Sequence, residues 1–134
     1  MPARSVGRMR NESDLYEYLT VYPHEMAFGA DDPGVVVDRW FTPDIAFRND
    51  GLSSTREALV THARPARKNA EAVRVKVHRA LLSGDAIAAH YTLYATLRST
   101  GPTATEICMV GRLAADERIA EIDQLTRAVP VEGE

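Results

Sequence analysis

Hydrophobic positions near the start of the chain recur with the spacing of an amphipathic helix. One face collects five of them: Leu15, Tyr18, Leu19, Tyr22 and Met26. Asn11 or Ser13 can cap this helix at its beginning, and Gly29 favours an end after Phe28. Pro23 lies inside the pattern and removes one backbone donor, so we expect it to kink the helix or to divide it.

Two further helices are indicated before the middle of the chain. Asp32 followed by Pro33 is a strong helix start, and this short helix should end at Thr42, because the residue before a proline avoids helical angles. Its apolar side would consist of Val36, Val37, Trp40 and Phe41. The segment 54–57 matches a capping box, which predicts a third helix that continues until Pro65 disturbs it.

The pattern then changes to the two-residue period of strands. A short strand is expected over 44–48, and Asn49-Asp50-Gly51 reads as a turn. From about residue 71 apolar and polar residues alternate. Longer strands follow at 71–82, 86–97, 105–113 and 118–125.

This order of elements predicts an α+β fold. Short connections favour antiparallel neighbours, and helices grouped ahead of a meander must cover one face of the sheet. Helices lying across a concave face would enclose an apolar cavity. We expect a flexible arm over residues 1–10, a single domain over 11–127 and a flexible tail over 128–134.

Composition narrows the class of protein. The chain has 134 residues, of which 45% are hydrophobic and 26% charged, and its net charge is −3 with both signs dispersed. Clustered basic residues that would indicate nucleic-acid binding are absent, and no apolar run is long enough for a membrane span. The single cysteine, Cys108, cannot form an internal disulfide, which fits a cytoplasmic protein.

Four stretches in this order resemble the SnoaL-like polyketide cyclase group of the nuclear-transport-factor-2-like superfamily; they lie at residues 31–47, 55–59, 83–93 and 111–122. The resemblance implies a cone-shaped barrel in which three N-terminal helices pack on a curved, mostly antiparallel sheet. It also implies a small-molecule pocket between the sheet and the helices, and a homodimer formed through the outer face of the sheet. Members of this superfamily perform acid–base chemistry without an obligatory metal or organic cofactor.

Site residues can be carried over position by position. The carboxylate base of ketosteroid isomerases aligns with Asn49, one residue before Asp50, and their phenolic donor falls near His24. Their second donor falls near Met109, a thioether that cannot donate a hydrogen bond. Where the cyclases have an aspartate on the last strand, this chain reads Leu125-Thr126-Arg127.

Three residues are our candidates for moving a proton. His24 follows Pro23 on the first helix, and it is either a general base at the cavity or a surface histidine. Asp50 is either a carboxylate at the cavity mouth or a turn residue that satisfies its own backbone. His62 lies three residues after Leu59, at a position that the resemblance turns toward the pocket.

The remaining candidates would contact the substrate: Tyr16, Trp40, Asn49, Tyr91, Met109 and Gln124. The resulting hypothesis is an enzyme that uses general acid–base catalysis on a small apolar intermediate. Polyketide or terpenoid cyclisation, isomerisation and epoxide or water chemistry all fit. The alternative is a small-molecule-binding or dimerisation module without chemistry. No metal is expected, because the four histidines lack the spacing of a metal motif, and the resemblance implies that no cofactor is needed.

Overall fold

A computed structural model of the chain describes residues 8–131, which form three helices and six strands. In chain order these are α1 Glu12–Phe28, α2 Pro33–Trp40, β1 Phe41–Asn49, β2 Leu52–Ser54, α3 Arg56–Asn69, β3 Ala70–Ser83, β4 Ala86–Leu97, β5 Gly101–Leu113 and β6 Ile119–Ala128. The expected order of helices and strands is confirmed, with β2 as an addition.

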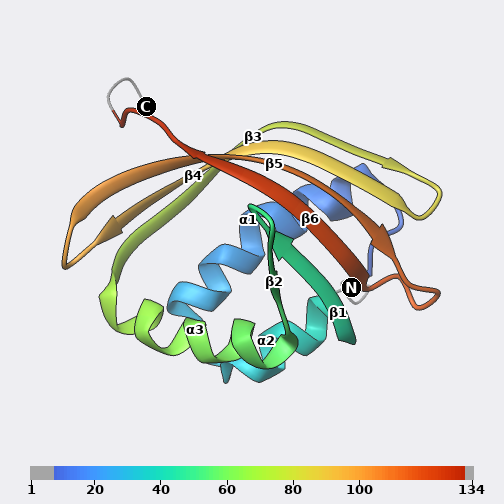
Figure 1. Cartoon of the computed structure of the whole chain (residues 1–134), viewed down its shortest axis with the longest axis horizontal. Helices are drawn as coiled ribbons and strands as arrows, with labels where there is room; N and C mark the ends of the chain where they lie inside the picture. The colour runs from blue at the N-terminus through green and yellow to red at the C-terminus, as the bar shows by residue number, and fades with distance from the viewer. Residues whose placement is uncertain (1–7, 132–134) are drawn as a thin grey trace, which may run out of the picture.

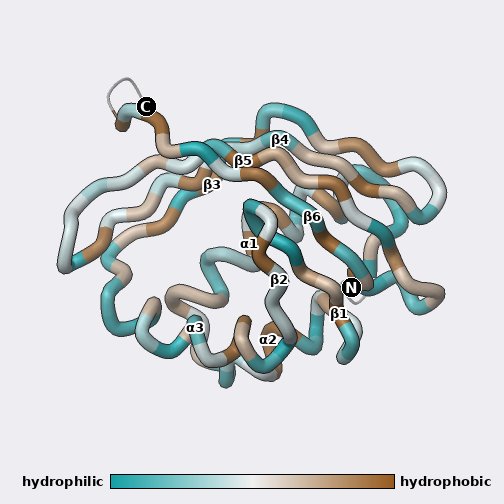
Figure 2. Tube along the Cα trace, in the orientation of Figure 1, coloured by the Kyte–Doolittle hydropathy of each residue, from teal (hydrophilic) through white to brown (hydrophobic). Residues whose placement is uncertain are grey.

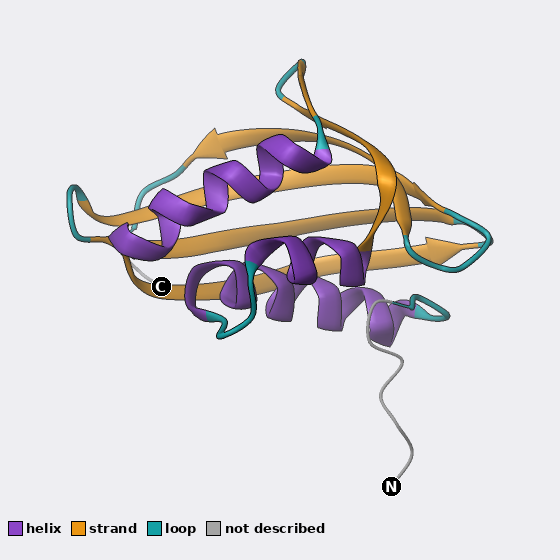
Figure 3. Cartoon of the chain, turned by 90° about the horizontal axis from the view of Figure 1, so that it is seen from below, coloured by secondary structure: helices purple, strands orange, loops and turns teal. Residues whose placement is uncertain are grey.

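The six strands form one curved sheet in the order β2-β1-β6-β5-β4-β3 (Figure 1). Neighbours are antiparallel except β1 and β6, which run parallel. All three helices lie on the same face of the sheet (Figure 3). The expected α+β cone is therefore confirmed, although the sheet is not closed into a barrel, since β2 and β3 are its two edges.

Helix α1 begins as the sequence indicates but is not divided. The Asn11 side chain accepts a hydrogen bond from the Asp14 backbone N–H at 2.9 Å, which caps the first turn. Pro23 lies within one continuous helix. A proline deletes a single backbone hydrogen bond, and the burial of Leu15 and Leu19 against the core outweighs that loss.

Helix α3 also runs past the proline that was expected to disturb it. Thr55 caps its start, and the helix continues through Pro65 to Asn69. Its last turn is tied to the end of α1, because the Arg67 guanidinium donates to the backbone carbonyls of Met26 and Glu25, both at 3.0 Å. These bonds hold the two helix ends together below the sheet.

The connection after α2 is tighter than expected. The helix ends at Trp40, and β1 starts directly at Phe41, so Pro43 lies inside a strand. The turn at its far end is confirmed: Asp50 and Gly51 have φ angles of 52° and 85°, a left-handed pair that suits a tight hairpin. That hairpin creates β2, which pairs with the end of β1.

The core lies between the concave face of the sheet and the helices. Apolar and polar residues alternate along the long strands (Figure 2), and the apolar set faces the helices. Fully buried side chains include Leu15, Val37, Trp40, Phe41, Ile119 and Ile122.

Residues 8–10, the last of those expected to form an arm, contact the rest of the domain. Met9 is buried in the core, and its backbone N–H donates to the Glu117 carbonyl at 3.1 Å. At the other end β6 extends to Ala128, and the Val129 N–H donates to the Ala104 carbonyl at 3.0 Å. The rest of the expected arm and tail, residues 1–7 and 132–134, lies outside the described residues. Within residues 8–131 no helix is long and apolar enough to cross a membrane.

Candidate active site

A cavity of about 190 Å³ lies between α1 and the concave face of the sheet. Its wall is mostly apolar and comes from α1, β1, β4, β5 and β6. The lining residues are Tyr18, Leu19, Tyr22, Pro23, Phe47, Tyr91, Leu93, Ile107 and Gln124. These elements meet because α1 lies across the concave face of the arched sheet (Figures 1 and 3).

Three tyrosines dominate the polar chemistry of this cavity. Tyr18 and Tyr22 stand one turn apart on α1 with their rings stacked at 5.3 Å, and Tyr91 reaches in from β4. Burial raises the pKa of all three phenols far above their usual range, and for Tyr18 and Tyr22 repulsion from an ionised Tyr91 adds to this. At neutral pH the cavity therefore contains neutral phenols whose hydroxyls lie near one another.

None of the three hydroxyls has a hydrogen-bond partner within the described part of the chain, and none is sealed off inside packed protein. Tyr18 and Tyr91 are more than nine-tenths buried as residues. Their hydroxyl oxygens keep some accessible surface, so a group that enters the cavity can form hydrogen bonds with them. The cavity thus presents donors and acceptors that the described protein does not itself satisfy.

A fourth polar group comes from the parallel pair of strands at one side. Asn49 on β1 and Gln124 on β6 are register partners, and the Gln124 Nε2 donates to the Asn49 Oδ1 at 2.9 Å. This bond fixes the Gln124 amide at the cavity wall and uses one of its two N–H donors. Its Oε1 remains available to accept a hydrogen bond.

Asp50 lies beside this pair, on the helix-facing side of β6. Its backbone N–H donates to the Gln124 carbonyl at 2.9 Å, and its carboxylate accepts from the Thr126 N–H at 2.7 Å and from the Thr126 hydroxyl. Those two bonds from Thr126 lower the pKa of Asp50, so the carboxylate is ionised at neutral pH. Asp50 is exposed and is not part of the cavity wall.

The two candidate histidines are placed elsewhere. His24 is exposed, and its ring centroid lies 5.1 Å from that of Phe28. His62 is exposed on α3, where Ala63 is the buried residue. The helix turns His62 about a third of a turn away from Ala63, and His62 is not part of the cavity wall.

Three of the expected substrate contacts are also not in the cavity wall. Tyr16 is exposed, because the buried stripe of α1 runs through Leu15 and Tyr18 on either side of it. Trp40 is packed in the core, where its Nε1 donates to the Glu25 Oε1 at 3.1 Å. Met109 faces the helices as expected from strand alternation, but it is buried in the packed core.

Sequence reasoning missed Tyr18 and Tyr22 as polar site residues. Both were counted only as members of an apolar helix face. A signal was present, since two phenols spaced by four residues place two hydroxyls on one side of a helix. Of the expected contacts, Tyr91 and Gln124 lie in the wall, and Asn49 holds Gln124 in place.

Other parts of the molecule offer weaker sites. A larger hollow of about 500 Å³ lies beside β1 and β6 and is lined by Arg48, Glu121 and Asp123 among others. Its lining is more polar than that of the smaller cavity, so the smaller cavity is the better candidate for an apolar ligand. Across residues 8–131 no cluster of three or more histidine, cysteine, aspartate or glutamate side chains could hold a metal ion.

Known structures share this architecture at low sequence identity. IdmH from Streptomyces antibioticus, provisionally described as a polyketide cyclase, is 16% identical with a TM-score of 0.64, covering 89% of this chain and 92% of that one. A Catenulispora acidiphila protein of ketosteroid isomerase-like fold, solved with trimethylamine, is 16% identical with a TM-score of 0.61, covering 82% of each chain. AclR from Streptomyces galilaeus, provisionally described as a hydroxylase, is 17% identical with a TM-score of 0.58, covering 69% of this chain and 62% of that one.

These likenesses establish the fold and leave the reaction open. No curated protein is significantly similar to the chain in sequence. The SnoaL-like domain family matches residues 22–122, a span that contains the starts of all six strands and every residue of the cavity wall except Tyr18, Leu19 and Gln124. The chain therefore belongs to the SnoaL-like domain family.

Proposed function

We propose that the cavity binds a small, largely apolar ring compound through an oxygen atom, and that the phenols of Tyr18, Tyr22 and Tyr91 hold that oxygen. The observation that carries this proposal is the set of three phenols in the cavity wall whose hydroxyls have no hydrogen-bond partner within the described residues. A carbonyl or hydroxyl oxygen would satisfy them, while the ring would contact Leu19, Phe47 and the other apolar wall residues.

The volume sets the size of the ligand. An apolar cavity of roughly 150 Å³ is enough for benzene. The 190 Å³ available here accommodates one six-membered ring with a substituent. A fused polycyclic substrate would have to extend beyond the cavity, so a single ring, or one end of a larger molecule, is the better fit.

Catalysis of proton transfer beside a carbonyl is the chemistry we propose for this site. Neutral phenols aimed at a carbonyl oxygen would stabilise the negative charge that develops when a neighbouring carbon loses a proton. Asp50, whose backbone N–H donates to the Gln124 carbonyl and whose carboxylate is ionised, would act as the base. The provisional description of IdmH as a polyketide cyclase supports this class of reaction.

Binding without chemistry is the second candidate. It is favoured by one observation: none of the cavity wall residues in the described chain is a carboxylate or an imidazole. A base must come within hydrogen-bond reach of the proton that it removes, and Asp50 is outside the wall. A carrier needs only the phenols and the apolar surface.

Cyclohexanone tests both candidates in one experiment. NMR in D₂O can follow its binding by line broadening and its enolisation by loss of the protons next to the carbonyl. The enzyme hypothesis expects binding together with accelerated exchange that Asp50→Asn abolishes while affinity is retained. Binding without accelerated exchange would support the carrier, and no binding at millimolar ligand would contradict the proposal as a whole.

A further inference from the structure

A row of four side chains crosses the outer face of the sheet, away from the helices. Cross-strand register places Val110 on β5, Asp123 on β6, Arg48 on β1 and Ser53 on β2 in one line. Ile122, the neighbour of Asp123 on β6, is buried in the core, so strand alternation turns the row to the opposite face. Because neighbouring strands lie about 4.8 Å apart, the row presents an apolar, an anionic, a cationic and a hydroxyl group at regular steps.

These four residues line the open hollow of about 500 Å³ beside β1 and β6. A volume of roughly 300–1,000 Å³ is usual for a small-molecule site. Val110 is 58% exposed, so it adds apolar surface beside the two charges. The hollow therefore has the size of a ligand site and contains groups for an anion, a cation and a hydrocarbon side chain.

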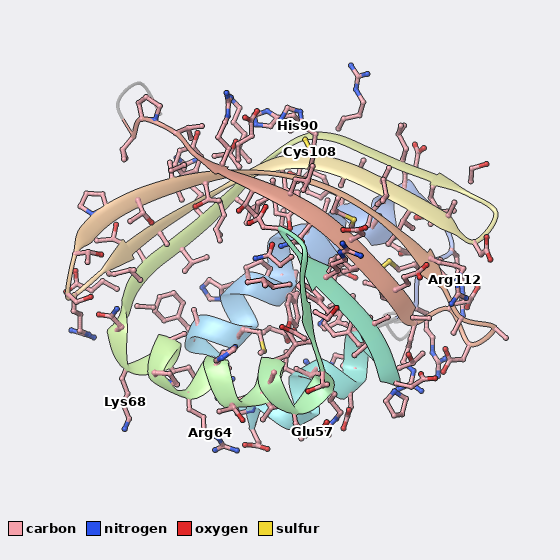
Figure 4. All side chains as sticks on the ribbon, in the orientation of Figure 1. Glu57, Arg64, Lys68, His90, Cys108 and Arg112 are labelled. Atoms are coloured by element: carbon pink, nitrogen blue, oxygen red, sulfur yellow. The ribbon has the colours of Figure 1, made fainter. Side chains whose placement is uncertain are left out.

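The two charges in the middle of the row have no partner in the described chain. Arg48 and Asp123 are register partners, yet neither forms a hydrogen bond or an ion pair within residues 8–131. Glu121, in the next row, is already paired with Arg112 at 3.7 Å, and Figure 4 shows Arg112 beside the start of β6. The hollow thus offers one free guanidinium and one free carboxylate at adjacent positions.

We propose that this hollow binds a free α-amino acid with an apolar side chain. The carboxylate of the amino acid accepts hydrogen bonds from the Arg48 guanidinium, whose paired donors match such a group, and from the Ser53 hydroxyl. Its ammonium donates to the Asp123 carboxylate, and its side chain contacts Val110. In an α-amino acid the carbon that bears the ammonium lies between the carboxylate and the side chain, which is the order of the row.

The neighbouring opposite charges select a ligand that carries both signs. A simple anion is attracted by Arg48 but repelled by Asp123, and a simple cation meets the reverse, whereas a zwitterion satisfies both. Since both groups are exposed, salt should weaken the binding. The site is independent of the tyrosine cavity, because it lies on the other face of β1 and β6.

Amide NMR titration of the isotope-labelled full chain with L-leucine tests the proposal directly. For a ligand of this size we expect saturable binding with a dissociation constant of about 1 mM or lower. The backbone amide signals of Arg48, Ser53, Val110 and Asp123 should move, and those of α3 should not. No saturable shift at these four positions up to about 20 mM leucine would overturn the proposal.

Analogues of leucine separate the contributions of its groups. Leucinamide lacks the carboxylate and N-acetylleucine lacks the ammonium, so we expect each to bind at least about tenfold more weakly, because each leaves one charge of the site unpaired. Glycine should also bind more weakly, since it has no side chain to contact Val110. Equal binding of N-acetylleucine would assign the hollow to peptide C termini, and equal binding of either charged-group analogue would contradict the amino-acid site.

Variants of the two charged residues provide the matching test on the protein. Arg48→Gln and Asp123→Asn remove one charge each and should weaken leucine binding at least about tenfold. Arg79→Gln and Asp44→Asn are the controls, because both residues are exposed and lie outside the hollow, and they should bind within about twofold of the wild type. Thermal midpoints confirm that each variant is folded. Equal losses in the binding and control variants would show a response to overall charge and would overturn the proposal.

Discussion

The Asp50 carboxylate is held by a single residue, Thr126, which donates both its backbone N–H and its hydroxyl to it. The two residues are separated by most of the chain, and they join the β1–β2 turn to the end of β6. Asp50 also has a left-handed backbone, with a φ of 52°. Asparagine tolerates that backbone well, so Asp50→Asn changes the charge without straining the turn.

This contact predicts a dependence of stability on pH. Because the bonds from Thr126 lower the folded-state pKa of Asp50 below its unfolded value of about 3.9, the stabilisation is complete above that value and is lost as the pH falls through the folded pKa. Asp50→Asn should therefore destabilise the protein near neutral pH and have no effect in strong acid. Urea unfolding of both proteins at about pH 7 and about pH 3 checks this. An equal difference at both pH values would contradict it.

Removing the cavity hydroxyls should leave the fold intact. Tyr18→Phe and Tyr91→Phe delete groups that have no protein partner, so we expect the free energy of unfolding to change by less than about 0.5 kcal/mol or to rise. Trp40→Phe is the contrasting variant, because it removes the bond to Glu25 and core volume, and it should cost about 2 kcal/mol or more. Large losses from the two tyrosine variants would mean that their hydroxyls are bonded after all.

The histidine candidates should be dispensable for binding. His24 and His62 are exposed and lie outside the cavity wall. We expect His24→Ala and His62→Ala to bind cyclohexanone with an affinity within about twofold of the wild type, a difference of about 0.4 kcal/mol. Calorimetric titration measures this. A tenfold loss of affinity in either variant would show that the substituted histidine contributes to ligand binding.

The segment before α1 should contribute to stability. Met9 is almost fully buried, so Met9→Ala should lower the free energy of unfolding by about 2–5 kcal/mol. Arg10→Ala is the control from the same segment, because the Arg10 side chain is exposed and forms only an exposed ion pair with Glu117 at 3.3 Å. That pair contributes at most about 1 kcal/mol. Similar effects of the two variants in denaturant unfolding would be incompatible with a buried Met9.

Periodicity was enough to predict most of the fold. The strand pattern from Val73 onward and the capping residue Asn11 each mark a local preference that the tertiary structure keeps. The third helix starts one residue later than the capping box over 54–57 indicates, with Thr55 as its cap. Pro23 and Pro65 misled because tertiary contacts beyond each proline hold the helix: Ala27 is buried after Pro23, and Arg67 after Pro65 donates to the carbonyls at the end of α1. The three-residue strand β2 is too short to show a period and depends on its pairing with β1.

The site was less predictable because it depends on helix rotation. An apolar helix face is broad, and spacing alone does not determine which of its residues borders open space and which is packed. Tyr18 and Tyr22 therefore looked like core residues, while His24 and His62 looked like pocket residues. Tyr91 was easier to predict, because a strand has only two faces and the apolar residues that alternate with it mark the buried one. Alternation left the face of Gln124 open, and only the family resemblance placed that residue at the pocket.

The central claim is that the three phenols bind an oxygen atom of a ring-sized ligand. Calorimetric comparison of cyclohexanone with methylenecyclohexane, which has the same shape without the oxygen, tests it most directly. We expect the wild type to prefer the ketone by about three- to tenfold, the contribution of one hydrogen bond. In the Tyr18→Phe, Tyr22→Phe, Tyr91→Phe triple variant that preference should disappear. Equal or tighter binding of the hydrocarbon by the wild type would contradict the account.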